Sequence, residues 1–138
     1  MAITCLNYLG VNSEHFEDWL EFATKILGMQ VTEKCNNSYS FRMDNQKQRL
    51  SVNYEKDSYK FFIGLEVDSP NDLESYAERL ERAGVLVYQG SPNIADRRFV
   101  ESFIYFHDLQ NNRIELVYKP MLNETIFAPG RTISGFKT

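Results

Sequence analysis

Apolar residues along the first half of the chain recur first at a strand-like spacing and then at a helical spacing. Residues 6–11 are mostly apolar and predict a strand, after which Asn12 or Ser13 is placed to cap a helix. Gly28 suits the position just past the end of this helix, where φ is commonly positive. The apolar face of the helix is predicted from Phe16, Trp19, Leu20, Ala23, Ile26 and Leu27. Three short strands are expected to follow, at residues 29–33, 38–43 and 48–54.

The same order of elements returns in the second half. Residues 61–67 predict a strand, and Ser69 is a candidate cap for a helix that has Pro70 at its first position. The residues Leu73, Tyr76, Ala77 and Leu80 predict the apolar face of that helix, which Gly84 ends. Strands are expected at residues 85–88, 102–106 and 112–118, with a polar loop at residues 89–100.

The two halves also match residue by residue. Tyr8-Leu9-Gly10-Val11 corresponds to Phe62-Ile63-Gly64-Leu65, because both run aromatic, aliphatic, glycine, aliphatic. At one constant offset, Ser38, Asp44, Arg49, Leu50, Val52 and Tyr54 match Ser102, Asp108, Arg113, Ile114, Leu116 and Tyr118. The pattern predicts an α+β domain of residues 1–120 built from two tandem βαβββ modules, at about residues 3–56 and 59–119. One such module is too small to cover both faces of its sheet, whereas two together can.

The composition narrows the class of protein further. A chain of 138 residues, 43% of them hydrophobic, can bury a real core, and its net charge of −4 argues against nucleic-acid binding. The first ten residues lack a positive segment followed by a long apolar run, so no signal peptide is expected. Cys5 and Cys35 are expected to be reduced thiols in a cytoplasmic protein.

Several stretches of the sequence carry a family resemblance. They are Leu6-Asn7-Tyr8-Leu9-Gly10, Leu27-Gly28-Met29-Gln30-Val31, Tyr39-Ser40-Phe41-Arg42-Met43-Asp44, Asn111-Asn112-Arg113-Ile114-Glu115-Leu116-Val117-Tyr118 and the tail from Phe127 to Thr138. The chain resembles the vicinal oxygen chelate (glyoxalase/bleomycin resistance/dioxygenase) superfamily, and within it the N-terminal domain of type I extradiol catechol dioxygenases such as 2,3-dihydroxybiphenyl dioxygenases. The resemblance implies cupped mixed sheets, and it implies that residues 121–138 correspond to the linker that leads to a catalytic domain.

The resemblance also implies where metal ligands would lie, on the first and last strands of each module. The internal repeat places these four positions at Tyr8, Ser51, Phe62 and Glu115. Extradiol cleavage requires two histidines and one carboxylate on Fe(II), which leaves room for the catechol and dioxygen. Only Glu115 is a competent ligand, and Tyr8 and Phe62 stand where the resemblance implies histidines in the catalytic domain. We therefore expect no metal and no catalytic residue in this chain, and Fe(II) only in the catalytic domain of the parent enzyme.

The remaining candidate residues have simpler interpretations. His15 and His107 are expected at the surface, and Arg97-Arg98 is expected to be a solvated or interface pair beside Asp96. Glu115 is interpreted as a leftover of the shared fold that needs Arg or Tyr partners if it is buried. The aromatic residues Trp19, Phe22, Phe41, Phe61, Phe62, Phe103, Tyr105 and Phe106 are expected mainly in the core.

Three hypotheses about function follow. The leading one is a non-catalytic N-terminal domain of an Fe(II)-dependent extradiol dioxygenase of the biphenyl-2,3-diol type, inactive alone, with a structural, oligomerisation or substrate-access role. Its partners would be the C-terminal catalytic domain and further copies in a homo-oligomer. The alternative is a stand-alone metal-free protein that binds a flat aromatic molecule in a cup lined by Tyr8, Phe62, Tyr105 and Glu115. The third, a metalloenzyme completed across a dimer, would need Glu115 together with His107 or His15, and the register of these residues argues against it.

Overall fold

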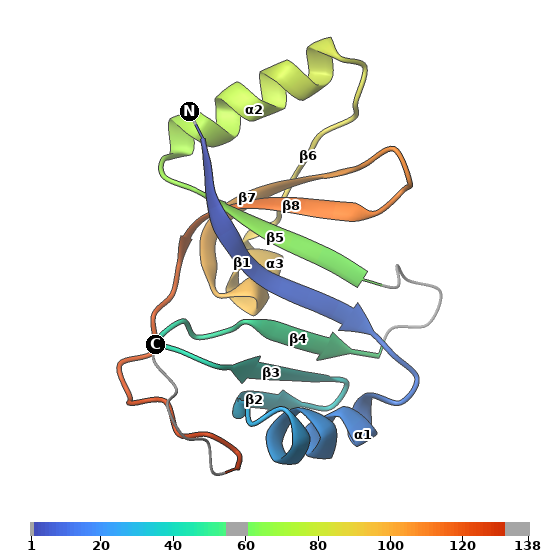
Figure 1. Ribbon diagram of the computed structural model, residues 1–138. Helices are drawn as coiled ribbons and strands as arrows, with labels where there is room; N and C mark the ends of the chain where they lie inside the picture. Colours follow the sequence, from blue (N-terminus) through green and yellow to red (C-terminus); the bar gives the residue numbers. More distant parts are fainter. Residues whose placement is uncertain (1, 55–60, 132–138) are drawn as a thin grey trace. The chain divides into compact units, whose positions relative to one another are not determined.

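The computed structural model describes residues 2–54 and 61–131, which fold into two compact units (Figure 1). Of the described residues, 9–54 and 122–131 form the β2–β4 unit, and 2–8 and 61–121 form the β5–β8 unit. Strand β1 (Ile3–Asn12) therefore contributes residues to both units. None of the helices within the described residues is long and apolar enough to cross a bilayer.

The β2–β4 unit is a small mixed sheet with helical cover. Its elements after β1 are α1 (Phe16–Glu21), the π-helix η1 (Phe22–Ile26), β2 (Gln30–Cys35), β3 (Ser38–Arg42) and β4 (Leu50–Asn53). The end of β1 runs parallel to β4, β4 is antiparallel to β3, and β3 is antiparallel to β2. The core of the unit is formed by Ala23, Phe41, Leu50 and Val52, with Phe16, Trp19 and Leu20 of α1 packed against it.

The β5–β8 unit repeats this arrangement with one addition. Its elements are β5 (Phe61–Val67), α2 (Pro70–Arg82), β6 (Tyr88–Gln89), α3 (Pro92–Arg98), β7 (Val100–His107) and β8 (Arg113–Pro120). Strand β5 is parallel to β8, while β7 pairs antiparallel with both β8 and β6. Helix α2 covers the face that carries Val67 and Leu116. Because neighbouring residues of a strand point to opposite faces, Glu115 of β8 points to the other face, and α3 contacts it there.

The register of the parallel pairs confirms the internal repeat. Gly10 of β1 lies opposite Ser51 of β4, and Gly64 of β5 lies opposite Glu115 of β8. These are the positions that the sequence alignment of the two halves had matched. The prediction of two βαβββ modules with mixed sheets is therefore confirmed.

The first helix differs from its prediction at both ends. His15 takes the N-cap position in place of Asn12 or Ser13, and Ser13 Oγ accepts the His15 backbone N–H at 3.0 Å. At the other end, Thr24 Oγ1 donates to the Leu20 carbonyl at 2.7 Å, and the last turn widens into η1. The widened turn breaks the 3.6-residue spacing. As a result, Ile26 and Leu27, predicted on the buried face, are 58% and 48% exposed.

Gly28 was correctly predicted at the end of this helix, and its φ is 78°. Ser69 and Pro70 likewise begin α2 as expected, with the Ser69 side chain accepting the Asp72 backbone N–H. Among the aromatic residues predicted mainly in the core, Phe22 and Phe61 are instead exposed.

The connection between α2 and β7 was predicted wrongly. The strand expected at residues 85–88 is reduced to Tyr88–Gln89, and the expected loop at residues 89–100 contains α3. The Ser91 side chain caps α3 by accepting the Ile94 backbone N–H, and Pro92 takes the first helical position. This Ser-Pro start is the same signal that correctly predicted α2.

A buried arginine anchors the tail that follows β8. Arg42 is fully buried, and its guanidinium donates to the carbonyls of Thr125 at 2.9 Å and Ile126 at 2.8 Å. Its Nε donates to Gln30 Oε1 at 3.0 Å, and the same oxygen accepts the Ala128 backbone N–H at 2.8 Å. The start of the tail is thus fixed to the β2–β4 unit, while its residues 132–138 lie outside the described residues.

We expect Arg42→Met to destabilise the chain by about 3 kcal/mol, because the hydrogen bonds from a fully buried guanidinium to Gln30 and to two tail carbonyls are lost. Arg79→Met, at an exposed position of α2, is the matched control and should stay within about 0.5 kcal/mol of the unsubstituted chain. Urea unfolding of both variants measures the difference. Equal midpoints for the two variants would show that Arg42 does not stabilise the tail.

Candidate functional site

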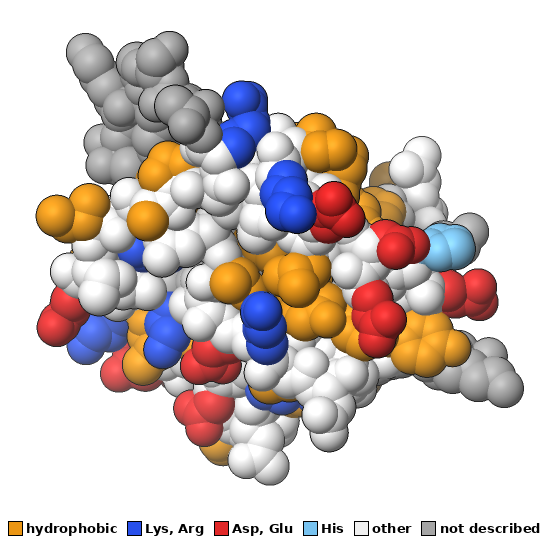
Figure 2. Space-filling model, turned by 90° about the horizontal axis from the view of Figure 1, so that it is seen from below, with side chains coloured by type: hydrophobic (Ala, Val, Ile, Leu, Met, Phe, Trp, Pro, Cys, Tyr) orange, Lys and Arg blue, Asp and Glu red, His pale blue; other side chains and the backbone are white. Residues whose placement is uncertain are grey.

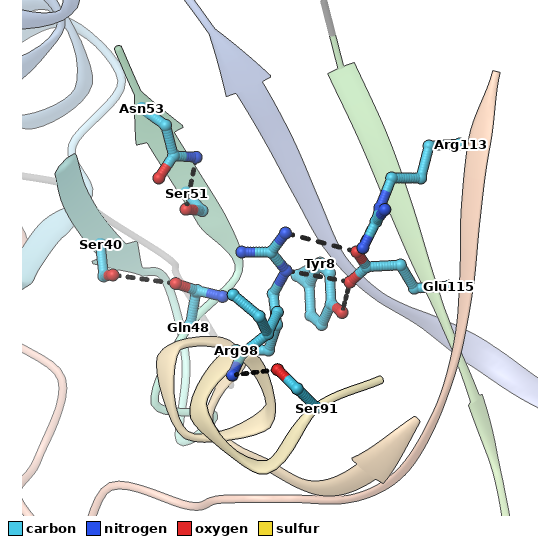
Figure 3. A network of polar contacts seen from close by, with 10 residues as sticks. Tyr8, Ser40, Gln48, Ser51, Asn53, Ser91, Arg98, Arg113 and Glu115 are labelled. Atoms are coloured by element: carbon cyan, nitrogen blue, oxygen red, sulfur yellow. Dashed lines mark hydrogen bonds and ion pairs between the residues drawn. The ribbon is translucent and has the colours of Figure 1, made fainter. Parts of the chain in front are cut away.

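Three of the four positions predicted to correspond to metal ligands lie together in the β5–β8 unit. Tyr8, Phe62 and Glu115 are each at most 1% exposed and come from β1, β5 and β8. Figure 3 shows the side chains of Tyr8 and Glu115 pointing toward each other. The Tyr8 hydroxyl donates to Glu115 Oε1, and the Tyr8 ring meets the Phe62 ring edge-on, with centroids 5.9 Å apart. The fourth position, Ser51, belongs to β4 in the other unit, where its hydroxyl accepts from Asn53 Nδ2 at 3.0 Å.

The absence of a side chain at Gly64 makes room for Tyr8. A Cβ built on Gly64 would lie 2.4 Å from Cζ of the Tyr8 ring. The ring cannot move aside cheaply, because it is buried and its hydroxyl is bonded to Glu115. The glycine shared by both halves of the repeat therefore has a packing role here.

The Glu115 carboxylate is surrounded by donors on both oxygens. Arg98 Nε donates to Oε1 at 3.0 Å, and Arg98 Nη2 approaches Oε2 at 3.3 Å. Arg113 Nε donates to Oε2 at 2.9 Å. Together with the Tyr8 hydroxyl, these contacts form what we call the Glu115 network: Tyr8, Arg98, Arg113 and Glu115. The prediction that a buried Glu115 needs Arg or Tyr partners is confirmed.

Arg98 is the residue that the sequence analysis misjudged. It was expected in a solvated or interface pair with Arg97, but its side chain is only 4% exposed, whereas Arg97 is exposed. Helix α3 ends at Arg98 because Phe99 adopts the left-handed conformation, with φ of 57°. The Arg98 guanidinium lies 3.9 Å from the centroid of the Phe62 ring, which adds a cation–π contact.

Arg113 is held in a similar way. Its guanidinium lies 3.6 Å from the centroid of the Tyr105 ring, and Tyr105 is the residue opposite Glu115 in the β7–β8 pair. Tyr105 was predicted as a possible ligand-lining residue. In the structure one face of its ring is covered by Arg113.

Burial raises the pKa of Tyr8 well above its ordinary value of 10.0, and the negative charge of Glu115 raises it further. The phenol is therefore a neutral donor throughout the physiological range. It contributes a hydrogen bond to the carboxylate but no second negative charge.

The residues at these positions do not fit an iron ion. Both Glu115 oxygens accept from arginine cations, which would repel a metal ion, and Phe62 offers no ligand atom. Residues 2–54 and 61–131 contain no group of three His, Cys, Asp or Glu side chains that could hold a metal. His15 and His107 are exposed, as the sequence indicated. A metal site completed across a dimer would require Glu115, whose oxygens are already engaged.

Paired βαβββ modules, each with its first strand parallel to its last, define the vicinal oxygen chelate class of proteins. A solved structure with this fold, described as catechol 2,3-dioxygenase, superposes with a TM-score of 0.89 at 30% identity, covering 98% of this chain and 48% of the other. The family model described as dihydroxybiphenyl dioxygenase BphC D1 matches residues 6–54.

Two curated relatives agree with the family model. The 3-methylcatechol 2,3-dioxygenase of Pseudomonas putida is 34% identical, over all of this chain and 48% of the relative. The biphenyl-2,3-diol 1,2-dioxygenase of Pseudomonas sp. strain KKS102 is 29% identical, over all of this chain and 47% of the relative. Over its full length, the chain is similar to about half of each of these extradiol dioxygenases. It spans about half the length of the curated relatives it matches.

These findings do not favour the stand-alone binding protein. The relatives named above are dioxygenases, and the face of the β5–β8 sheet proposed to bind a flat molecule carries α3 and its buried Arg98. A ligand over Phe62 would have to displace the Arg98 guanidinium from Glu115.

We expect Glu115→Gln to destabilise the chain by about 3–5 kcal/mol, because the buried Arg98 and the partly buried Arg113 would lose their counter-charge. Glu101→Gln, at an exposed position of β7, is the matched control. Urea unfolding monitored by circular dichroism compares the two variants. A Glu115→Gln variant as stable as the Glu101→Gln control would show that the network adds nothing to folding.

Removal of the Tyr8 hydroxyl should give a pH-dependent effect. Near neutral pH, Tyr8→Phe should cost about 1–2 kcal/mol, because one donor to a buried carboxylate is lost. The folded chain keeps Tyr8 protonated above pH 10.0, where an unfolded tyrosine ionises. The stabilisation from Tyr8 is thus fully present below about pH 10 and declines as the pH rises toward the folded-state pKa.

The measurement is the free energy of unfolding of the unsubstituted chain and of Tyr8→Phe between pH 7 and about pH 11. The difference between them should shrink above about pH 10. A difference that stays constant or grows in this range would contradict a raised pKa for Tyr8.

Proposed function

We propose that the chain is the non-catalytic N-terminal domain of an Fe(II)-dependent extradiol dioxygenase that cleaves catechols of the biphenyl-2,3-diol type. In this role it supports the fold and assembly of a catalytic domain. One observation carries the proposal. Glu115, the only competent ligand among the four equivalent positions, is bound by Arg98, Arg113 and Tyr8.

The geometry of the network supports a structural role. It joins a residue of β1, a residue of α3 and two residues of β8, elements that are far apart in the chain. A catalytic metal site keeps an open position for its substrate. Here side-chain donors occupy the positions around the carboxylate. The Glu115 network therefore joins β1, β8 and α3 to one another.

The substrate and the iron would belong to the rest of the parent enzyme. The relatives are named for 3-methylcatechol and biphenyl-2,3-diol, which share a catechol ring. We propose the same class of substrate for the parent, with Fe(II) held by the catalytic domain. The exposed thiols of Cys5 and Cys35 support a reducing compartment such as the cytoplasm.

A chimera tests the proposed function. This chain would replace the first half of the Pseudomonas putida 3-methylcatechol 2,3-dioxygenase, to which it aligns over its full length. With Fe(II), the chimera should form yellow ring-fission product from 3-methylcatechol within about tenfold of the parent rate, since the catalytic half is unchanged. The isolated chain with Fe(II) should form none. Turnover by the isolated chain, abolished by Glu115→Gln, would overturn the proposal.

A further inference from the structure

Helix α1 and the π-helix η1 carry an apolar face that points to solvent. Phe22 is 42% exposed and Ile26 is 58% exposed. Trp19, which is half-buried and packed against the core of the unit, lies three positions before Phe22, and the two rings meet edge-on with centroids 5.4 Å apart. We call Trp19, Phe22 and Ile26 the η1 face. Figure 2 shows hydrophobic side chains gathered in the middle of the side of the molecule seen from below, where α1 lies in Figure 1.

The π-helical turn places Phe22 and Ile26 of this face at the surface. The Leu27 backbone N–H donates to the Phe22 carbonyl at 3.0 Å, and the Thr24 hydroxyl donates to the Leu20 carbonyl. In this turn only Ala23 remains fully buried. The helix therefore places its larger apolar residues at the surface, and contiguous exposed apolar patches of this kind mark interaction sites.

The tail of the chain contacts η1 and the residues that follow it. The Gly130 backbone N–H donates to the Gly28 carbonyl at 3.2 Å, and Arg131 Nε donates to the Ile26 carbonyl at 2.9 Å. A Cβ on Gly130 would lie 2.4 Å from the Thr24 carbonyl oxygen, so the tail backbone lies directly against η1. Arg42 holds the preceding residues of the tail, as described above. The last described residues are thus fixed beside the η1 face.

The relatives indicate what would cover this face. This chain matches their N-terminal domain and spans 48% and 47% of their lengths. In those proteins, the segment equivalent to the tail leads into the remaining half. We propose that the η1 face docks against that second half, the catalytic domain of the parent enzyme. This inference rests on the proposed function, because it needs a following domain.

The chemistry of the face fits an interface within one chain. A short connection gives the two domains a high effective concentration, so a small apolar contact suffices where separate proteins would need a larger one. Aromatic anchors such as Trp19 and Phe22 are the residue types that dominate contact energies. The matching surface of the catalytic domain is therefore expected to be apolar at its centre.

Lysine substitutions in the chimera test this interface. Ile26→Lys, with Phe22→Lys as a second variant, should make the chimera lose activity on heating about tenfold faster or more, because a charge is placed in a desolvated contact. Leu86→Lys, at a position that is 74% exposed in the β5–β8 unit, is the matched control and should leave the rate of loss unchanged. In the isolated chain, Ile26→Lys and Leu86→Lys should both unfold at the same urea concentration as the unsubstituted chain.

The outcomes separate the two proposals. A chimera that folds but cleaves no catechol overturns the proposed function, and the docking proposal with it. An active chimera that Ile26→Lys and Leu86→Lys affect equally overturns the docking proposal alone. A second result would also overturn the docking proposal. If the isolated chain forms a dimer in sedimentation, and Ile26→Lys dissociates that dimer but leaves the chimera unaffected, the face binds a second copy of this chain.

Discussion

The β5–β8 unit depends on the buried carboxylate of Glu115, which must be matched by donors from other elements. A buried ion that loses its partner costs about 3–5 kcal/mol, a large part of the roughly 5–15 kcal/mol that stabilises a typical domain. Tyr8, Arg98 and Arg113 provide the match. The position of α3, which delivers Arg98, and the glycine at position 64, which admits Tyr8, both follow from this requirement.

The same requirement distinguishes a structural carboxylate from a metal-binding carboxylate in modules of this fold. A carboxylate at the end of a cupped sheet can serve as one of three ligands to iron, provided that histidines stand beside it and open positions remain. Here the neighbouring positions hold Tyr8 and Phe62, and two guanidinium groups supply the positive charge in place of a metal ion. A guanidinium has only hydrogen-bond donors, in a fixed planar arrangement. It can therefore occupy the acceptor sites of the carboxylate, but it cannot coordinate dioxygen or a catechol as a metal ion does.

Local patterns predicted much of the fold, and non-local pairing explains what they missed. The spacing of apolar residues predicted most of the strands, and the Ser69-Pro70 start predicted α2. Constant offsets between the two halves predicted the repeat. Helix α3 has the same start at Ser91-Pro92, but its segment lacks an apolar face, and the periodicity therefore indicated a loop. The burial of Arg98 depends on Glu115, seventeen residues away, and on the left-handed conformation of Phe99, which is rare for a bulky residue. The outward position of Ile26 accompanies the π-helix η1, where the Thr24 hydroxyl donates to the Leu20 carbonyl.

Two buried arginines join separate elements of their units in similar ways. Arg98 fixes a helix to a strand in one unit, and Arg42 fixes the tail to β2 and β3 in the other. An apolar side chain of similar volume could often stabilise a core as well as a buried charge does. A fork of directed hydrogen bonds, however, is satisfied in only one arrangement of its acceptors. Arg42 therefore determines the path of the tail in addition to stabilising the fold, and the last described residue of the tail contacts Ile26.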